Sequence, residues 1–165
     1  ALFPDARVVH RLDMSTSGLM LFARGAAAQR QLNTAFASGA VAKQYVAVVE
    51  GRVQGDSGVI DEPLAADWPN RPRQVVDGER GKPSSTRWRV LERAQDSTRL
   101  LLEPITGRTH QLRVHLQWLG HPIRGDALYA PTPLRADRLL LHATLLALTH
   151  PLTGQPCRFA SAAAF

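Results

Sequence analysis

The apolar and polar positions in the first third of the chain predict two strands and one helix. Residues 17–24 form a short apolar run that has the size of one buried strand. Residues 26–38 combine helix-forming residues with apolar side chains at helical spacing, and Gly39 follows as a helix stop. Residues 41–50 then alternate as a strand does and are rich in β-prone valines.

The rest of the chain predicts short strands, long loops and a second helix. Residues 55–83 hold many of the glycines and prolines, which favours short strands with long connections. Residues 110–119 place three leucines on one helical face before Gly120. Further strands are predicted at residues 86–91, 99–103, 139–148 and 157–160. Together the elements indicate an α+β fold in one domain over residues 1–165, with a mixed, mostly antiparallel sheet flanked by a few helices and long loops.

The charge of the chain indicates a polyanionic partner. The formal net charge is +6 and the pI is about 10.6, which favours nucleic acid as that partner. Lys43 and Lys82 are the only lysines among 20 basic residues, and the planar guanidinium of arginine suits phosphates and bases. A GC-rich genome would also raise the arginine content, so the charge alone leaves nucleic-acid binding open.

Cysteine content and hydropathy indicate a soluble, cytoplasmic protein. Cys157 is the only cysteine, which excludes an internal disulfide and a cysteine zinc cluster and fits a reducing cytosol. The longest apolar stretch, residues 139–148, is far shorter than the roughly 20 residues that span a bilayer. We therefore expect no membrane partner.

The stretch VVHRLDMSTSGL places an acid, Asp13, beside an arginine and before a run of small polar residues. Two interpretations of Asp13 stay open from chemistry alone. Its carboxylate can accept hydrogen bonds from the following backbone, which is the commonest use of an aspartate before Ser-Thr-Ser. It can also be the catalytic carboxylate of a site.

A second stretch, TGRTHQLRVH, follows a predicted strand and opens a predicted helix. The free N–H groups and the positive end of a helix suit an anion, so Arg108 and its neighbours could meet a phosphate or hold a carboxylate from elsewhere in the fold. The alternative is a helix start capped by Thr106 or Thr109, with the arginines in solvent. The pattern does not separate these interpretations.

Three motifs in this order resemble those of the RluA family of pseudouridine synthases. HRLDMSTSGLMLFAR is similar to the family's catalytic motif and places Asp13 at its catalytic aspartate. KQYVAVVEG resembles the second motif, with Tyr45 at the active-site tyrosine, and TGRTHQLRVH resembles the third, with Arg108 at the arginine that pairs with the aspartate. GHPIRGD and LLHA match further family segments. The resemblance covers nearly the whole chain and implies the pseudouridine synthase fold.

The resemblance implies a redox-neutral isomerisation of uridine that needs no cofactor and no metal. Asp13 would act at the ribose, either by adding to C1′ or by removing the C2′ proton, and Arg108 would keep it ionised through a two-pronged ion pair. Tyr45 would stack on the uracil and could assist proton removal from C5, although a phenol with an ordinary pKa of about 10 is not ionised near neutral pH. Leu112 would form the apolar wall on the other face of the base.

RNA contacts are expected from the motifs and from the middle of the chain. A uridine in a loop must be flipped out to reach a recessed carboxylate, and Arg11 is placed to fill the vacated stack. Arg113 in the third motif and Arg71 in the proline-rich middle segment are further expected contacts. His10 is also a candidate contact, although His10 and His142 are more typical of histidines that hydrogen-bond inside a fold.

The middle segment PLAADWPNRP resembles the dual-specificity branch of the family. This implies an enzyme that modifies a tRNA anticodon stem-loop at uridine-32, a 23S rRNA hairpin at uridine-746, or both, and we expect it to be a monomer. Family members usually begin further upstream of the catalytic motif, so we expect the chain to lack an N-terminal segment. Two rival functions are an RNA-binding module without catalysis and a nuclease, which would need paired carboxylates and Mg²⁺. Neither explains the ordered motifs.

Overall fold

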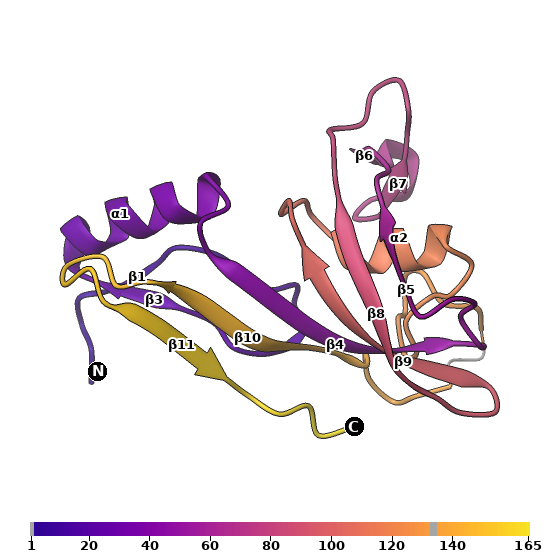
Figure 1. The fold of residues 1–165 in the computed structure, drawn as a ribbon. Coiled ribbons are helices and arrows are strands. Elements are labelled where there is room, and N and C mark those ends of the chain that lie inside the picture. The colour runs from indigo at the N-terminus through magenta and orange to yellow at the C-terminus, as the bar shows by residue number, and fades with distance from the viewer. Residues whose placement is uncertain (1, 133–134) are drawn as a thin grey trace.

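A seven-stranded sheet runs through the molecule (Figure 1). The structure is a computed structural model that describes residues 2–132 and 135–165. The strands of this sheet are β2 (Ser17–Gly18), β4 (Ala42–Glu50), β5 (Ser57–Ile60), β8 (Thr86–Arg93), β9 (Ser97–Pro104), β10 (Leu141–Thr149) and β11 (Pro156–Ala160). Their order is β11-β10-β4-β9-β8-β5 with antiparallel neighbours, and β2 adds a parallel pair with β10. The sheet confirms the predicted α+β fold.

Two shorter sheets and, in the described part of the chain, two α-helices accompany this sheet. β1 (Ala6–Val8) pairs with β3 (Phe22–Arg24), and β6 (Leu64–Ala66) pairs with β7 (Gln74–Val76) across a short 3-10 helix, η1 (Trp68–Asn70). The helices are α1 (Gly25–Ala37) and α2 (Gln111–Trp118). Figure 1 shows α1 with β1 and β3 at one end of the molecule, and α2 with β6 and β7 at the other. Both predicted helices are confirmed.

The predicted single strand at residues 17–24 is wrong, because the stretch divides into β2 and β3. β2 pairs with β10, whereas β3 pairs with β1. Between them, the Leu21 N–H donates to the imidazole Nε2 of His10 at 2.8 Å. A side chain therefore takes the place of a strand neighbour, which an apolar pattern does not reveal.

α1 ends at the glycine that the sequence predicts. Gly39 has a φ of 74°, a conformation that residues with a Cβ rarely adopt. The Ala40 N–H donates to Ala35 O and the Gly39 N–H donates to Phe36 O, which together close a Schellman motif. This turn fixes the end of α1, where residues 36–39 line a cavity.

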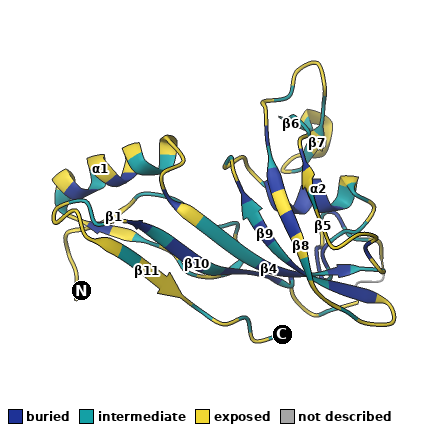
Figure 2. Ribbon diagram, in the orientation of Figure 1, coloured by how far each residue is buried: buried dark blue, intermediate teal, exposed yellow. Residues whose placement is uncertain are grey.

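The hydrophobic core forms two main clusters. The larger packs α2 against β4, β8 and β9 and includes the fully buried Leu100, Leu102 and Leu116. The second packs α1 onto β3 and β10 through Leu32 and Leu146. Burial of each such leucine stabilises the fold by about 1.5–3 kcal/mol. Figure 2 shows the contrast between the mostly buried β10 and the exposed edge strand β11.

Candidate active site

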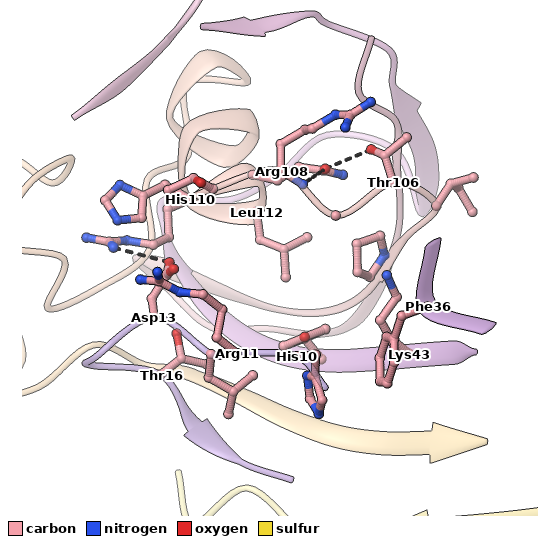
Figure 3. A pocket seen from close by; sticks show the side chains of 18 of the residues that line it. His10, Arg11, Asp13, Thr16, Phe36, Lys43, Thr106, Arg108, His110 and Leu112 are labelled. Carbon is pink, nitrogen blue, oxygen red and sulfur yellow. Dashed lines mark hydrogen bonds and ion pairs between the residues drawn. The ribbon is translucent and has the colours of Figure 1, made fainter. Parts of the chain in front are cut away.

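A cavity of about 550 Å³ brings the three motifs together (Figure 3). The first motif, the end of α1, the start of β4 and the loop before α2 form its walls. The residues predicted for the site that line it are His10, Arg11, Asp13, Tyr45, Arg108, Leu112 and Arg113. Segments far apart in the sequence therefore converge on one space.

A close backbone approach holds the Asp13 segment against β10. Gly18 has a φ of 107°, and a Cβ at this position would lie 2.3 Å from the carbonyl oxygen of Ala143. Only glycine allows this contact. The turn after Asp13 is closed by the main chain, because the Thr16 N–H donates to Asp13 O at 2.9 Å. The segment is thus fixed without use of the Asp13 carboxylate.

Among the described residues, the Asp13 carboxylate has one hydrogen-bond partner, Arg113. Nη1 of Arg113 donates to Oδ2 of Asp13 at 3.3 Å. The alternative in which the carboxylate caps the following backbone is not formed in the structure. The side chain of Asp13 is 21% exposed, so its carboxylate is accessible from the cavity.

Arg113 is held in place by a buried aspartate, Asp126. Its Nε and Nη2 donate to the two carboxylate oxygens of Asp126 at 2.7 and 2.8 Å. The two residues are only 6% and 1% exposed. Burial alone would lower the pKa of Arg113, but the hydrogen bonds and charges of Asp126 and Asp13 outweigh it and raise the pKa. A permanent, oriented cation therefore points its third nitrogen at Asp13.

The predicted ion pair between Arg108 and Asp13 is wrong. Arg108 is exposed, and its Nε donates to the carbonyl oxygen of Pro83 at 3.2 Å. Arg113, predicted to contact RNA, is buried and contacts Asp13 instead, with a single nitrogen rather than two. The two-pronged ion pair of this site is the one between Arg113 and Asp126.

α2 begins without the threonine cap that the sequence allowed. His110 is the N-cap residue, with a φ of 54° and no side-chain cap. The Gln111 side chain fixes the loop instead: its Oε1 accepts from the Arg108 N–H at 2.9 Å and from Thr106 Oγ1 at 2.7 Å. Its amide nitrogen donates to two further acceptors next to the start of β8. A buried glutamine, rather than Thr106 or Thr109 as N-cap, therefore shapes this wall of the cavity.

Tyr45 and Leu112 give the cavity its flat and apolar surfaces. Leu112 is 7% exposed, and Figure 3 shows its side chain directed into the cavity. Burial, and then the nearby charge of Asp13, raise the pKa of Tyr45 to about 12. The phenol is therefore protonated at neutral pH, which suits stacking and hydrogen bonding and opposes a role as an ionised base.

Positive charge predominates in the cavity. Arg11, Lys43, Arg108 and Arg113 line the cavity, and Asp13 is the one acid among its described lining residues. Arg11 and Arg108 are exposed, whereas burial of Lys43 lowers the pKa of its ammonium group. A cavity with more basic than acidic side chains attracts an anionic ligand such as an RNA strand.

His10 and His142 hydrogen-bond inside the fold, as the sequence favoured. His10 Nε2 accepts a hydrogen bond from the Leu21 N–H, which lies between β2 and β3. The His10 ring also stacks on Phe36, with ring centroids 4.5 Å apart. His142 bonds Ser17 Oγ through Nδ1 at 2.9 Å and Ser161 Oγ through Nε2 at 3.1 Å. Both histidines thereby brace the Asp13 segment, and His10 also lines the cavity.

His110, Asp126 and Tyr129 also had no role assigned from the sequence. His110 Nδ1 and the Tyr129 hydroxyl are 2.7 Å apart, and the Gln74 N–H donates to the same hydroxyl at 2.8 Å. Burial lowers the pKa of His110, with the charge of Asp13 opposing it, which favours the neutral ring. GHPIRGD contains Asp126, but its partner depends on the chain returning to α2, which no local pattern reveals.

Arg71 lies outside the active-site cavity. Its guanidinium carbon is 3.9 Å from the ring centroid of Trp68, an exposed side chain of η1. The expected RNA contact of Arg71 stays a prediction, now at a second surface.

The residues that the structure describes contain neither a metal-ligand cluster nor a membrane-spanning helix. No group of three or more histidine, cysteine, aspartate or glutamate residues among them could hold a metal ion. None of their helices is long and apolar enough to cross a membrane. Metal independence of the reaction stays a prediction for experiment.

Comparison with known proteins places the chain in a family. Residues 4–118 match the family model described as RNA pseudouridylate synthase. The dual-specificity RNA pseudouridine synthase RluA of Escherichia coli strain K12 is 51% identical over 166 residues, covering 99% of this chain and 76% of that protein. RluA of Yersinia pestis is 49% identical, covering 99% of this chain and 81% of that protein.

Solved structures agree with the sequence comparison. Human RNA pseudouridylate synthase domain containing 1 has a TM-score of 0.85 and 33% identity, covering 98% of this chain and 70% of that chain. Human RNA pseudouridylate synthase domain containing 4 has a TM-score of 0.80 and 27% identity, covering 96% of this chain and 71% of that chain. The fold is that of pseudouridine synthases, and the chain belongs to the RNA pseudouridylate synthase family. Within this family it is similar to the dual-specificity RluA enzymes.

Proposed function

We propose that this chain is an RNA pseudouridine synthase that isomerises uridine with Asp13 as its catalytic carboxylate. The proposal rests on the single hydrogen bond of the Asp13 carboxylate and on its accessibility from the cavity. Its one hydrogen-bond partner in the described residues is a buried arginine, and its carboxylate is open to a cavity that Tyr45 and Leu112 also line. A carboxylate with a fixed direction and an accessible oxygen is what attack at a ribose requires.

The reaction breaks the N1–C1′ bond of uridine, turns the uracil and joins it again through C5. Asp13 either adds to C1′ as the N1–C1′ bond breaks and leaves again when the C5–C1′ bond forms, or it takes the C2′ proton and returns it after that bond has formed. Arg113 fixes the direction of this carboxylate through its hydrogen bond to Oδ2. The C5 proton leaves at the end and balances the proton gained at N1. Tyr45 and Leu112 hold the uracil between a ring and an aliphatic side chain while it turns.

The target uridine has to leave its stack to reach Asp13, at a cost of a few kcal/mol. Arg11 lies in the same motif, is exposed and lines the cavity. Its guanidinium plane is placed to fill the vacated position among the bases. Arg108 lies on the opposite wall as a second exposed cation and contacts the RNA backbone.

The substrates we propose are a short tRNA anticodon stem-loop and a 23S rRNA hairpin with a similar loop. The names of the RluA relatives support this choice, because those enzymes are described as dual-specificity RNA pseudouridine synthases. Loop bases are already poorly stacked, which lowers the cost of flipping. We further propose that the enzyme acts in the cytoplasm as a monomer and needs no metal.

Carbodiimide-stop sequencing tests this function on two RNAs that are incubated with the chain: a hairpin and a single strand of scrambled sequence. We expect pseudouridine at one loop uridine of the hairpin, little or none in a single strand of scrambled sequence, and the same yield in EDTA. Binding without any pseudouridine would instead support the non-catalytic RNA-binding module. Strand cleavage that requires Mg²⁺ would support the nuclease.

A further inference from the structure

A second cavity, of about 480 Å³, lies next to the active-site cavity. Strand β6 and residues of η1 and β7 form one side, and Lys82 closes it from the segment that follows β7. Residues 107–109 line both cavities, so this loop is the wall between them. A nucleotide chain with one residue at Asp13 can reach the second cavity across a single loop.

The second cavity is basic. Arg80, Lys82 and Arg108 line it, and its described lining contains no aspartate or glutamate. Arg80 pairs with Asp77 at 2.7 Å, so its charge is partly compensated. Lys82 and Arg108 are exposed, and the Nε of Arg108 donates to a neutral backbone carbonyl. These two cations suit a phosphate group.

Trp68 adds a flat apolar surface to these cations. Its side chain lines the second cavity and is 65% exposed, although tryptophan is usually buried. The Arg71 guanidinium lies over its ring at 3.9 Å. An exposed aromatic ring beside cations is the surface on which unpaired nucleic-acid bases stack.

We propose that the second cavity binds another unpaired nucleotide of the substrate RNA, close to the target uridine in the loop. Its base stacks on Trp68, and its phosphate contacts Lys82 and Arg108. The proposal rests on the proposed function, because the target uridine must occupy the cavity at Asp13. The volume lies within the roughly 300–1,000 Å³ that is typical of small-ligand sites. Stacking tolerates any base, so this subsite reads the shape of the loop.

Backbone pairing orders the second cavity before RNA arrives. The Lys82 N–H donates to Leu64 O at 2.8 Å, and the Leu64 N–H donates to Lys82 O at 3.0 Å. The loop that carries Trp68 is closed by a bond from the Asp67 N–H to Arg73 O at 3.0 Å. Little backbone ordering is therefore needed on binding, which favours affinity.

An abasic scan of a hairpin that the wild-type chain converts tests the subsite. Each loop nucleotide other than the target is replaced in turn by an abasic one, and affinity and turnover are measured. One abasic position should weaken wild-type binding by roughly 5- to 140-fold, the loss of one base–aromatic stack. Trp68→Ala should bind the intact hairpin as weakly as the wild type binds the hairpin with that abasic nucleotide. The abasic nucleotide should then cause no further loss of affinity in Trp68→Ala.

Two matched variants complete the test. Trp118→Ala removes another exposed tryptophan, 52% exposed, which lines neither cavity, and it should bind every hairpin as the wild type does. Lys82→Ala should lower the slope of log affinity against log salt by about 0.7, whereas Arg158→Ala on the edge strand β11 should not.

The outcomes separate the two proposals. If the wild-type chain forms no pseudouridine in any hairpin, the proposed function fails and the subsite fails with it. If the wild type converts the hairpin but Trp68→Ala binds it with full affinity, the subsite alone is overturned. The same holds if Trp68→Ala keeps the full penalty at the abasic position that weakens the wild type.

Discussion

Replacing Asp126 by asparagine isolates the ion pair that aims Arg113. Asp126 accepts from Arg113 Nε and Nη2 and from the backbone N–H groups of Leu128 and Tyr129. Asparagine keeps one oxygen and places an NH₂ group against an N–H donor. The buried cation then loses its closer counter-charge, and breaking a buried ion pair typically costs about 3–5 kcal/mol of folding stability. Because both side chains are almost fully buried, solvent does little to reduce this figure.

The same substitution should lower turnover more than RNA affinity. The Arg113–Asp13 contact is the long one, at 3.3 Å, and it depends on the orientation that Asp126 imposes. A shift of about 1 Å in a positioning group can cost on the order of 10²-fold in rate. Since Asp126 is 1% exposed, it has no surface for RNA to contact. We therefore expect kcat to fall by about this factor and KM to change little.

Urea unfolding and tritium release from RNA labelled at C5 of uridine measure the two effects. Asp96→Asn is the matched control, because Asp96 is 59% exposed and pairs with Arg124 and Arg135 at the surface. That control should lose less than about 1 kcal/mol and keep its kcat. If Asp126→Asn unfolds and turns over as the control does, the buried pair has no positioning role and the reasoning fails.

Three further predictions follow from single residues. Arg108→Ala should weaken RNA binding and lower the slope of log affinity against log salt by about 0.7, while most of kcat at saturating RNA is kept. A loss confined to kcat would instead support an ion pair between Arg108 and Asp13. The raised pKa of Tyr45, about 12, keeps it protonated below pH 10, so kcat should be flat from pH 7 to 9; a rise of about tenfold per pH unit would reveal an ionised tyrosine as the base. Gly18→Ala should lose more than about 2 kcal/mol in urea unfolding, because its Cβ would meet Ala143 at 2.3 Å; wild-type stability would show that the close approach is absent.

Elements with strong local signals were predictable from the sequence. The helix at residues 26–38 and its stop at Gly39 appear as α1 and a Schellman motif, because apolar spacing and a left-handed glycine are local properties. The strand at residues 41–50 appears as β4 for the same reason. The run at residues 17–24 was not predictable as two strands, because its division depends on a bond to His10.

The contacts within the site could be predicted only in part from local sequence patterns. Seven of the eight predicted site residues line the cavity, but Arg113 and not Arg108 contacts Asp13. Both arginines lie in one short motif, and the choice between them depends on Asp126, which reaches α2 from a later segment. The left-handed φ of His110 likewise gives no signal in the sequence.

The most direct test of the central claim is turnover by Asp13→Asn, measured as tritium release from a C5-labelled hairpin that the wild-type chain converts. Asparagine has nearly the shape of aspartate but no negative charge for chemistry at the ribose. The carboxylate makes a single hydrogen bond among the described residues, so the variant should fold and bind RNA almost as the wild type does. We expect no release above background in the presence of near-normal RNA affinity. Release at a substantial fraction of the wild-type rate would contradict the assignment of Asp13 as the catalytic carboxylate.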